Sequence, residues 1–226
     1  MNYRSFREDE PLIEWAANLI RDGLSLPGSK NLLVTGGQSC IPIYDRLAAM
    51  DIGWPRVSVT LTDERFVDPS SPDSNEGMIR AHLLQGHAAQ ANFVPLKGAG
   101  PTAQDDAEAA ADAVRALIPF DVVLVSQGED GHIASIFPDD PHAWDYLNPR
   151  DPRLLVGIDE AGMAPFVPRI TMTLGGIIAA KLVVLLVRGQ TRREVFSRSQ
   201  TDWDFDPPVA MLMRHSRAPV HVLFGP

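Results

Sequence analysis

The chain has 226 residues, of which 45% are hydrophobic and 22% are charged, and its formal net charge is -9. This composition is typical of a folded globular protein and excludes an intrinsically disordered chain. The acidic balance argues against a nucleic-acid partner, because such binding needs a basic face that neutralises phosphates. A small anionic ligand is still compatible with it, since a few arginines can make one cleft positive.

Cysteine usage and hydropathy favour a cytoplasmic protein. Cys40 is the only cysteine, so no intramolecular disulfide can form, and nothing indicates an oxidising compartment. Residues 1–10 are polar and charged, unlike a secretory signal. The most apolar region, 166–187, is interrupted by Arg169 and Lys181, which argues against a membrane span. We therefore expect a cytoplasmic protein with no membrane partner.

Short apolar runs alternate with helical patterns along most of the chain. This alternation predicts an α/β fold in three layers, with a mostly parallel, doubly wound sheet and helices on both of its faces. No internal repeat or low-complexity linker interrupts it, so we expect a single domain over residues 1–226. The predicted strands are 31–35, 57–62, 92–96, 121–126, 154–158, 170–174, 182–187 and 220–224.

Helices are predicted between these strands. Residues 11–20 place Leu12, Trp15, Ala16, Leu19 and Ile20 at helical spacing. The predicted segments that follow are a helix over 41–50 with Ile43, Leu47 and Met50 inside and Pro42 in its first turn, a helix near 78–84, a helix capped by Thr102 and Asp105 that runs to about Leu117, and an exposed loop over 203–208.

A glycine-rich loop follows the first of these predicted strands. In open α/β sheets ligands bind beyond the carboxyl ends of the strands. Gly36, Gly37, Gln38 and Ser39 stand at such a position, just before a predicted helix. Free backbone N–H groups at a helix start attract phosphate, and Ser39 adds a hydroxyl donor. The alternative is a tight turn without a ligand.

Two acids and an arginine end the next strand. Asp63, Glu64 and Arg65 follow residues 57–62, and Ser74-Asn75 comes shortly before the helix near 78–84. A guanidinium at this place can bind phosphate or carboxylate oxygens through two donors. The alternative is a solvated loop with an internal Asp–Arg pair.

The run from Gly128 to His132 follows the apolar strand 121–126. Histidine titrates nearest to neutrality, so His132 can take a proton from water and return it within one cycle. Asp130 can orient the imidazole or stabilise its charged form. The alternative is an ordinary Asp-Gly turn with a surface histidine.

Two further arginines stand at strand ends. Arg169 begins the strand 170–174, and Arg192 follows Gly189 after the strand 182–187, where a phosphate would be favoured. Each could equally be a solvated surface residue. We find no serine-nucleophile elbow, no dinucleotide or triphosphate loop and no metal-ligand spacing among the six histidines, and we assign Cys40 no catalytic role.

Taken in order, these stretches resemble the 6-phosphogluconolactonase family over roughly residues 10 to 225. The most characteristic stretch is 128–138, from Gly128 to Pro138. The others are Gly36-Gly37-Gln38-Ser39, Asp63-Glu64-Arg65 with Ser74-Asn75, Arg169-Ile170-Thr171, and Gly189-Gln190-Thr191-Arg192. Two features depart from the family's pattern. In the family, threonine and proline usually come directly after the serine of the glycine loop, whereas here Gln38 stands before Ser39, Cys40 follows it and the proline comes only at Pro42. Arg192 stands where lysine is usual.

The resemblance implies a fold of the glucosamine-6-phosphate deaminase type and a cofactor-free, metal-free enzyme. The implied reaction is hydrolysis of 6-phospho-D-glucono-1,5-lactone in the oxidative pentose phosphate pathway. His132 would be the general base, with Asp130 supporting it and Arg65 near the substrate. The expected binding residues for the substrate and its phosphate are Gly36, Gly37, Gln38, Ser39, Asp63, Arg169 and Arg192. The phosphosugar lactone is the expected partner, bound by a monomer or homodimer.

Two other functions stay open on the sequence. A glucosamine-6-phosphate deaminase would share the Asp-Gly-His stretch but continue with a phenylalanine, an asparagine and a glutamate, whereas this chain has Ser135-Ile136-Phe137-Pro138. A non-catalytic phosphosugar sensor would need no base, yet both Asp130 and His132 are present. We therefore favour the lactonase.

Overall fold

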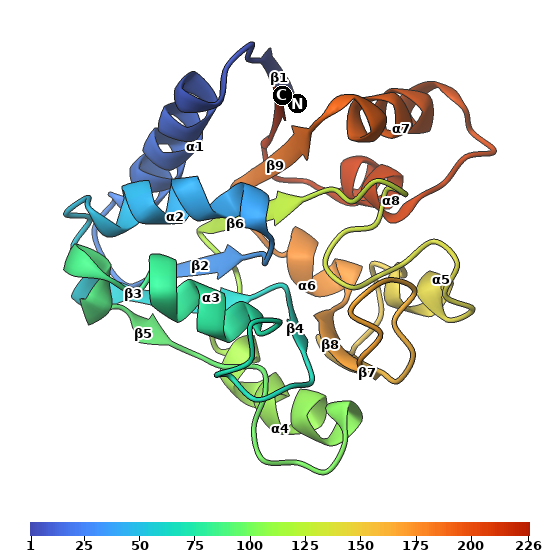
Figure 1. The fold of residues 1–226 in the computed structure, drawn as a ribbon, viewed down its shortest axis with the longest axis horizontal. Helices are drawn as coiled ribbons and strands as arrows, with labels where there is room; N and C mark the ends of the chain where they lie inside the picture. Colours follow the sequence, from blue (N-terminus) through green and yellow to red (C-terminus); the bar gives the residue numbers. More distant parts are fainter.

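The computed structural model describes residues 1–226 and contains two β-sheets (Figure 1). Seven strands form the larger sheet: β1 (Asn2–Ser5), β2 (Lys30–Val34), β3 (Val57–Leu61), β5 (Asn92–Phe93), β6 (Val122–Ser126), β9 (Val183–Arg188) and β10 (Val220–Gly225). Their order is β1-β10-β9-β6-β2-β3-β5, and all neighbours are parallel. The predicted parallel α/β sheet is thus confirmed.

The smaller sheet corrects the prediction for two strands. It contains β4 (Asp63–Arg65), β8 (Arg169–Met172) and β7 (Leu155–Ile158), in that order and all antiparallel. We expected 154–158 and 170–174 to join the main sheet. Both segments are buried apolar runs, and such runs look alike whichever sheet they enter. β1 and β4 were not predicted, since one is exposed throughout and the other has three residues.

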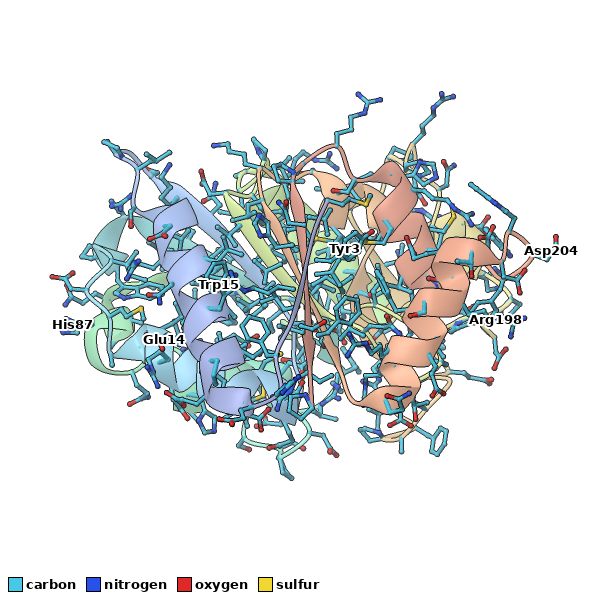
Figure 2. The ribbon with its side chains drawn as sticks, turned by 90° about the horizontal axis from the view of Figure 1, so that it is seen from above. Tyr3, Glu14, Trp15, His87, Arg198 and Asp204 are labelled. Carbon is cyan, nitrogen blue, oxygen red and sulfur yellow. The ribbon has the colours of Figure 1, made fainter.

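Helices cover both faces of the main sheet. Figure 2 shows α1 and α7 on opposite sides, with Tyr3 of β1 between them. The helix α1 contacts α2, which contacts α3; on the other side α7 contacts α8, which contacts α6, while α4 packs on β7 and β8. The helices are α1 (Asp9–Leu24), α2 (Ile41–Ala48), α3 (Asn75–His82), α4 (Ala103–Arg115), α5 (Ala143–Tyr146), α6 (Leu174–Ile178), α7 (Gln190–Thr201) and α8 (Pro208–His215).

The apolar face of α1 differs from the predicted one at Trp15. Leu12, Ala16 and Ile20 are fully buried as expected, but Trp15 is 39% exposed. Its ring lies beside the buried stripe and faces the guanidinium of Arg4, 3.5 Å from the ring centre. A cation over the indole face stabilises this half-exposed position.

Several other local predictions are confirmed, and the ends of some predicted elements are shifted: α2 ends at Ala48, α3 spans Asn75–His82 and β5 ends at Phe93. Pro42 occupies the first turn of α2, and the Thr102 hydroxyl accepts from the Asp105 N–H to cap α4. The loop between α7 and α8 leaves Trp203 78% exposed. Leu174 does not end a strand but begins α6. No helix combines the length and apolar character needed to cross a bilayer.

The winding direction of the main sheet reverses between β2 and β6. From β2 the chain proceeds outward to β3 and β5, and then returns to the other side of β2 to build β6, β9 and β10. Strands β6 and β9 are almost entirely buried, as strands covered on both faces must be. Such a reversal leaves a crevice at the carboxyl ends of the two strands beside it. The loops after β2 and β6 therefore meet there.

At the amino ends of these strands, away from the crevice, the carboxylate of Asp121 binds two lysines. Asp121, just before β6, accepts from Lys30 Nζ at 3.2 Å, from Lys181 Nζ at 2.9 Å and from the backbone N–H of Asn31 at 2.9 Å. Burial by itself would raise the pKa of Asp121, but these hydrogen bonds and the lysine charges outweigh it and hold that pKa below the usual value. The ionised carboxylate therefore stabilises the fold.

We expect Asp121→Asn to lower the free energy of unfolding by about 2–3 kcal/mol at pH 7, because it leaves the buried ammonium of Lys30 without its counterion. A carboxyl group whose pKa is lowered in the folded state stabilises that state at pH values above its unfolded pKa of about 3.9. This stabilisation is lost as the pH falls through the folded-state pKa. The gap to wild type in urea unfolding should therefore narrow below about pH 4. Asp112→Asn, at an exposed position of α4, is the control; equal loss in both variants would contradict the assignment.

Candidate functional site

One large cavity opens at the carboxyl ends of the main-sheet strands. It has a volume of about 620 Å³, and the loops after β2 and β6 line it together with β4, β8 and the first turn of α7. Nine of the ten predicted site residues line it: Gly36, Gly37, Gln38, Ser39, Asp63, Arg65, His132, Arg169 and Arg192. The tenth, Asp130, is hydrogen-bonded to His132. The structure thus brings all ten together from five separate segments.

Both glycines of the first loop are required, one by its surroundings and the other by its backbone conformation. A Cβ atom on Gly36 would lie 2.0 Å from Oδ1 of Asn75, so only glycine lets the loop approach the start of α3. Gly37 has a φ of 106°, which side-chain-bearing residues rarely adopt. Residues Gln38–Cys40 then form a 3-10 turn that leads into α2. The loop therefore makes a tight turn from β2 into α2.

Cys40 is enclosed behind this loop. It is fully buried, and burial raises the pKa of its thiol to about 11. The thiol is therefore protonated at neutral pH and is a poor nucleophile. The expectation that Cys40 has no catalytic role agrees with this position.

Two arginines face each other across the smaller sheet. Arg65 of β4 and Arg169 of β8 are direct partners in the antiparallel ladder, where like charges destabilise each other. Burial and then the charge of Arg65 lower the pKa of Arg169. Arg65 donates to the carbonyl of Asp73 at 2.6 Å, and Arg169 to that of Pro165 at 2.8 Å.

Neither guanidinium forms an ion pair with a carboxylate of the chain, and the Nε atoms of both have no hydrogen-bond partner in the protein. The internal Asp63–Arg65 pair that the sequence left open does not form. Arg169 is 2% exposed, so it is not a solvated surface residue. Two unpaired positive charges at one cavity wall favour an anionic ligand.

The acids beside Arg65 have different partners. Asp63 accepts from the Thr62 hydroxyl at 2.9 Å and from the Ser135 hydroxyl at 2.7 Å, so its carboxylate is held at the cavity wall. Glu64, which sequence reasoning left without a role, turns away to the start of α3. It accepts from the N–H groups of Arg65 at 2.6 Å, Asn75 at 2.8 Å and Glu76 at 2.6 Å.

Glu64 therefore fixes Arg65 and α3 relative to each other. Burial raises the pKa of Glu64, although the three backbone N–H groups lower it in part. In the sequence Glu64 stands between Asp63 and Arg65, and nothing in the motif indicates that its role differs from theirs. Only the tertiary contact with the amino end of α3 distinguishes its task.

The His132 ring is held from three sides. Its Nδ1 lies 2.6 Å from Oδ1 of Asp130, and the same oxygen accepts the His132 backbone N–H at 3.0 Å. The ring packs on Phe137 with centres 5.1 Å apart. A Cβ on Gly128 would lie 2.0 Å from its Cε1, so glycine makes room for the imidazole.

This arrangement selects one tautomer of His132. A carboxylate only accepts, so Nδ1 carries the proton and Nε2 has the lone pair. Burial alone would raise the pKa of Asp130, but the hydrogen bond and charge of His132 outweigh it and hold that pKa below its usual value. Asp130 thus stays ionised at neutral pH, and Nε2 is the atom able to take a proton.

Arg192 lies in the first turn of α7 and approaches the cavity from the side of β9. Its Nη1 lies 3.4 Å from Oε1 of Glu129, and its Nε donates to the backbone carbonyl of Gln127 at 3.1 Å. Arg188, at the end of β9, donates to the carbonyl of Ser39 at 3.0 Å and so braces the glycine loop. Sequence reasoning missed Gln127 and Arg188, because neither belongs to a motif.

Taken together, the fold and the cavity define a doubly wound α/β protein with an acid–histidine pair and a cluster of arginines at its switch point. The family model for glucosamine-6-phosphate isomerases/6-phosphogluconolactonase matches residues 10–221. The chain therefore belongs to this family, as the resemblance in its motifs predicted.

Individual relatives agree with this assignment. A 6-phosphogluconolactonase of Caulobacter vibrioides is 38% identical over 227 residues, covering 98% of this chain and 96% of the relative. The crystal structure of a 6-phosphogluconolactonase from Shewanella baltica OS155 has a TM-score of 0.93 at 29% identity, covering 100% and 98% of the two chains. A monomeric glucosamine-6-phosphate deaminase, 16% identical and covering 100% and 97%, shares the fold with a TM-score of 0.82.

We expect Glu64→Gln to lower the free energy of unfolding by about 2 kcal/mol, because the amide NH2 would face a backbone N–H that now donates to an oxygen. Chemical denaturation measures this loss. Glu14→Gln, on the exposed side of α1 (Figure 2), should change it by less than about 0.5 kcal/mol. A Glu64 variant as stable as wild type would show that the three N–H contacts contribute little.

Proposed function

We propose that this chain hydrolyses 6-phospho-D-glucono-1,5-lactone to 6-phospho-D-gluconate, with His132 as the general base. The observation that carries the proposal is the His132–Asp130 pair on the same cavity as three arginines. The names of the relatives at 30–38% identity support the substrate. The same resemblance supports a place in the oxidative pentose phosphate pathway, in the cytoplasm.

The proposed reaction begins with a water molecule at Nε2 of neutral His132. Nε2 takes a proton from the water as its oxygen attacks the lactone carbonyl, and negative charge develops on the carbonyl oxygen. The bond to the ring oxygen then breaks, and His132 returns the proton to that oxygen. One water is consumed, and the products are a carboxylic acid and a hydroxyl group on the opened sugar.

Asp130 acts on this cycle through the imidazole. Its ionised carboxylate holds the Nδ1 proton in place and stabilises the imidazolium that exists between the two proton transfers. The Phe137 ring and Gly128 keep the imidazole from rotating away from the water. The catalytic pair is therefore prepared before the substrate arrives, which lowers the reorganisation needed in the transition state.

Positive groups on the walls suit the anionic substrate. The glycine loop from Gly36 to Ser39 and Arg192 would bind the phosphate, since backbone N–H groups at the start of a helix and guanidinium donors both match phosphate oxygens. Arg65 and Arg169 bring unpaired charge to the same cavity and can stabilise the developing oxyanion. Each carboxylate oxygen of Asp63 accepts from one hydroxyl and keeps a further lone pair, so Asp63 can accept from sugar hydroxyls but has nothing to donate to a phosphate.

The deaminase alternative lacks support at the positions that would distinguish it. Ser135 uses its hydroxyl to hold Asp63, and Phe137 packs on the His132 ring. The extra carboxylate that ring opening and enolisation would require does not follow His132 in this chain.

We expect His132→Ala to lower the rate above spontaneous hydrolysis by about 10²-fold or more. The measurement uses freshly generated 6-phosphogluconolactone and subtracts the uncatalysed rate. His87→Ala, at an exposed histidine on the edge of the molecule (Figure 2) that does not line the cavity, should leave the rate unchanged. A wild-type protein that does not exceed the spontaneous rate would overturn the proposed reaction, and an active His132→Ala would overturn the base.

We expect Asp130→Ala to lower kcat more than it changes KM, because Asp130 acts through the imidazole rather than on the substrate. The double variant Asp130→Ala, His132→Ala should be no slower than His132→Ala alone, since the two residues work as one unit. Additive losses in the double variant would mean that Asp130 has a separate task.

A further inference from the structure

Gln127 is a buried amide between β6 and the loop that carries His132. It is 2% exposed and lines the large cavity. Its backbone N–H donates to the Leu186 carbonyl of β9 at 3.0 Å, and it forms an antiparallel bridge with Ile133. The main sheet and the His132 loop therefore hold the backbone of Gln127 in place.

Two hydrogen bonds join Gln127 to Arg192 in both directions. The Gln127 side chain donates from Nε2 to the Arg192 carbonyl at 2.8 Å, and Arg192 donates from Nε to the Gln127 carbonyl at 3.1 Å. The first bond fixes the backbone at the start of α7, and the second fixes the plane of the guanidinium. Only the terminal nitrogens of Arg192 are then left to contact Glu129, the Arg188 carbonyl or a bound anion.

Stability alone does not explain a glutamine at this place. Its Oε1 is buried and has no hydrogen-bond partner in the protein. An unpaired buried oxygen is unfavourable, and an apolar side chain of similar length would avoid it. The contact to Arg192 is the one interaction of this side chain that an apolar residue could not make.

We propose that Gln127 is a positioning residue: its side chain holds the Arg192 backbone at the place from which Nε reaches the Gln127 carbonyl and the guanidinium turns toward the substrate phosphate. This inference rests on the proposed function, in which Arg192 binds that phosphate. A guanidinium is planar and its donors point in fixed directions, so the strength of its hydrogen bonds to a phosphate depends on its orientation. A lysine ammonium is a compact charge with rotatable donors and needs no such clamp. The dependence on Gln127 should therefore exist only while residue 192 is an arginine.

The test combines Gln127→Met, nearly isosteric, with Arg192→Lys and the double variant. Isothermal titration with 6-phosphogluconate measures phosphosugar binding without any need for catalysis. In parallel, kcat/KM is measured for 6-phosphogluconolactone and for unphosphorylated glucono-1,5-lactone. Gln200→Met, an exposed glutamine near the other end of α7, is the matched control. Thermal unfolding is recorded for every variant, and Gln127→Leu replaces Gln127→Met should the latter not fold.

Gln127→Met should weaken 6-phosphogluconate binding and lower kcat/KM for the phosphorylated lactone by about tenfold. Activity on the unphosphorylated lactone should stay within about twofold, and the unfolding temperature should not fall. In the Arg192→Lys background, Gln127→Met should change 6-phosphogluconate binding and kcat/KM by less than about twofold.

Equal losses on both lactones, a lower unfolding temperature, or the same tenfold loss beside lysine would overturn the positioning role. Unchanged 6-phosphogluconate binding by Gln127→Met would overturn it as well, and so would a wild-type protein that does not bind 6-phosphogluconate. A wild-type protein that binds 6-phosphogluconate but hydrolyses no lactone would instead overturn the proposed reaction, while the binding comparison would still decide the role of Gln127.

Discussion

The parallel pairing of β2 with β6 determines where the candidate site lies. Because the winding reverses between these two strands, their carboxyl ends cannot both be covered by the helices that follow them. The glycine loop leaves from one strand and the His132 loop from the other. Groups nearly 100 residues apart in the chain thus share one cavity, and each is supported by a buried strand rather than by a neighbouring loop. The Asp121 ion pair closes the opposite end of the same strands.

The site is built from charges that the fold does not neutralise. Arg65 and Arg169 face each other in the small sheet, and the nearest acids are engaged elsewhere, Asp63 by hydroxyls and Glu64 by backbone N–H groups. Mutual repulsion of two guanidiniums is unfavourable in the free protein, and an anion placed between them would relieve it. Asp63, Glu64 and Arg65 are adjacent in sequence but have different surroundings. Asp63 is held at the cavity wall by Ser135, Glu64 accepts from backbone N–H groups at the start of α3, and Arg65 lines the cavity without an ion-pair partner.

Local patterns predicted most of the main sheet and the membership of the cavity. Strands such as β6 and β9 are apolar because both faces are covered, and motifs at their ends are recognisable without the tertiary structure. The small antiparallel sheet was not predicted, since strand direction and partner choice leave no mark within a four-residue run such as β8. Glu64 was noticed only as part of its motif, and Gln127 and Arg188 were not noticed, because each of the three contacts a backbone group distant in sequence.

The contrast between the whole molecule and its cavity has a consequence for diffusional encounter. The chain carries a net charge of -9, while three arginines line the cavity. A phosphorylated substrate in solution feels the net negative charge only weakly, because charges more than about one Debye length away, roughly 8 Å at physiological ionic strength, are largely screened. Added salt screens the distant repulsion more than the close attraction. Capture of the substrate is thus a short-range event, decided at the mouth of the cavity, and its rate is less sensitive to salt than that of a protein with a positive overall field.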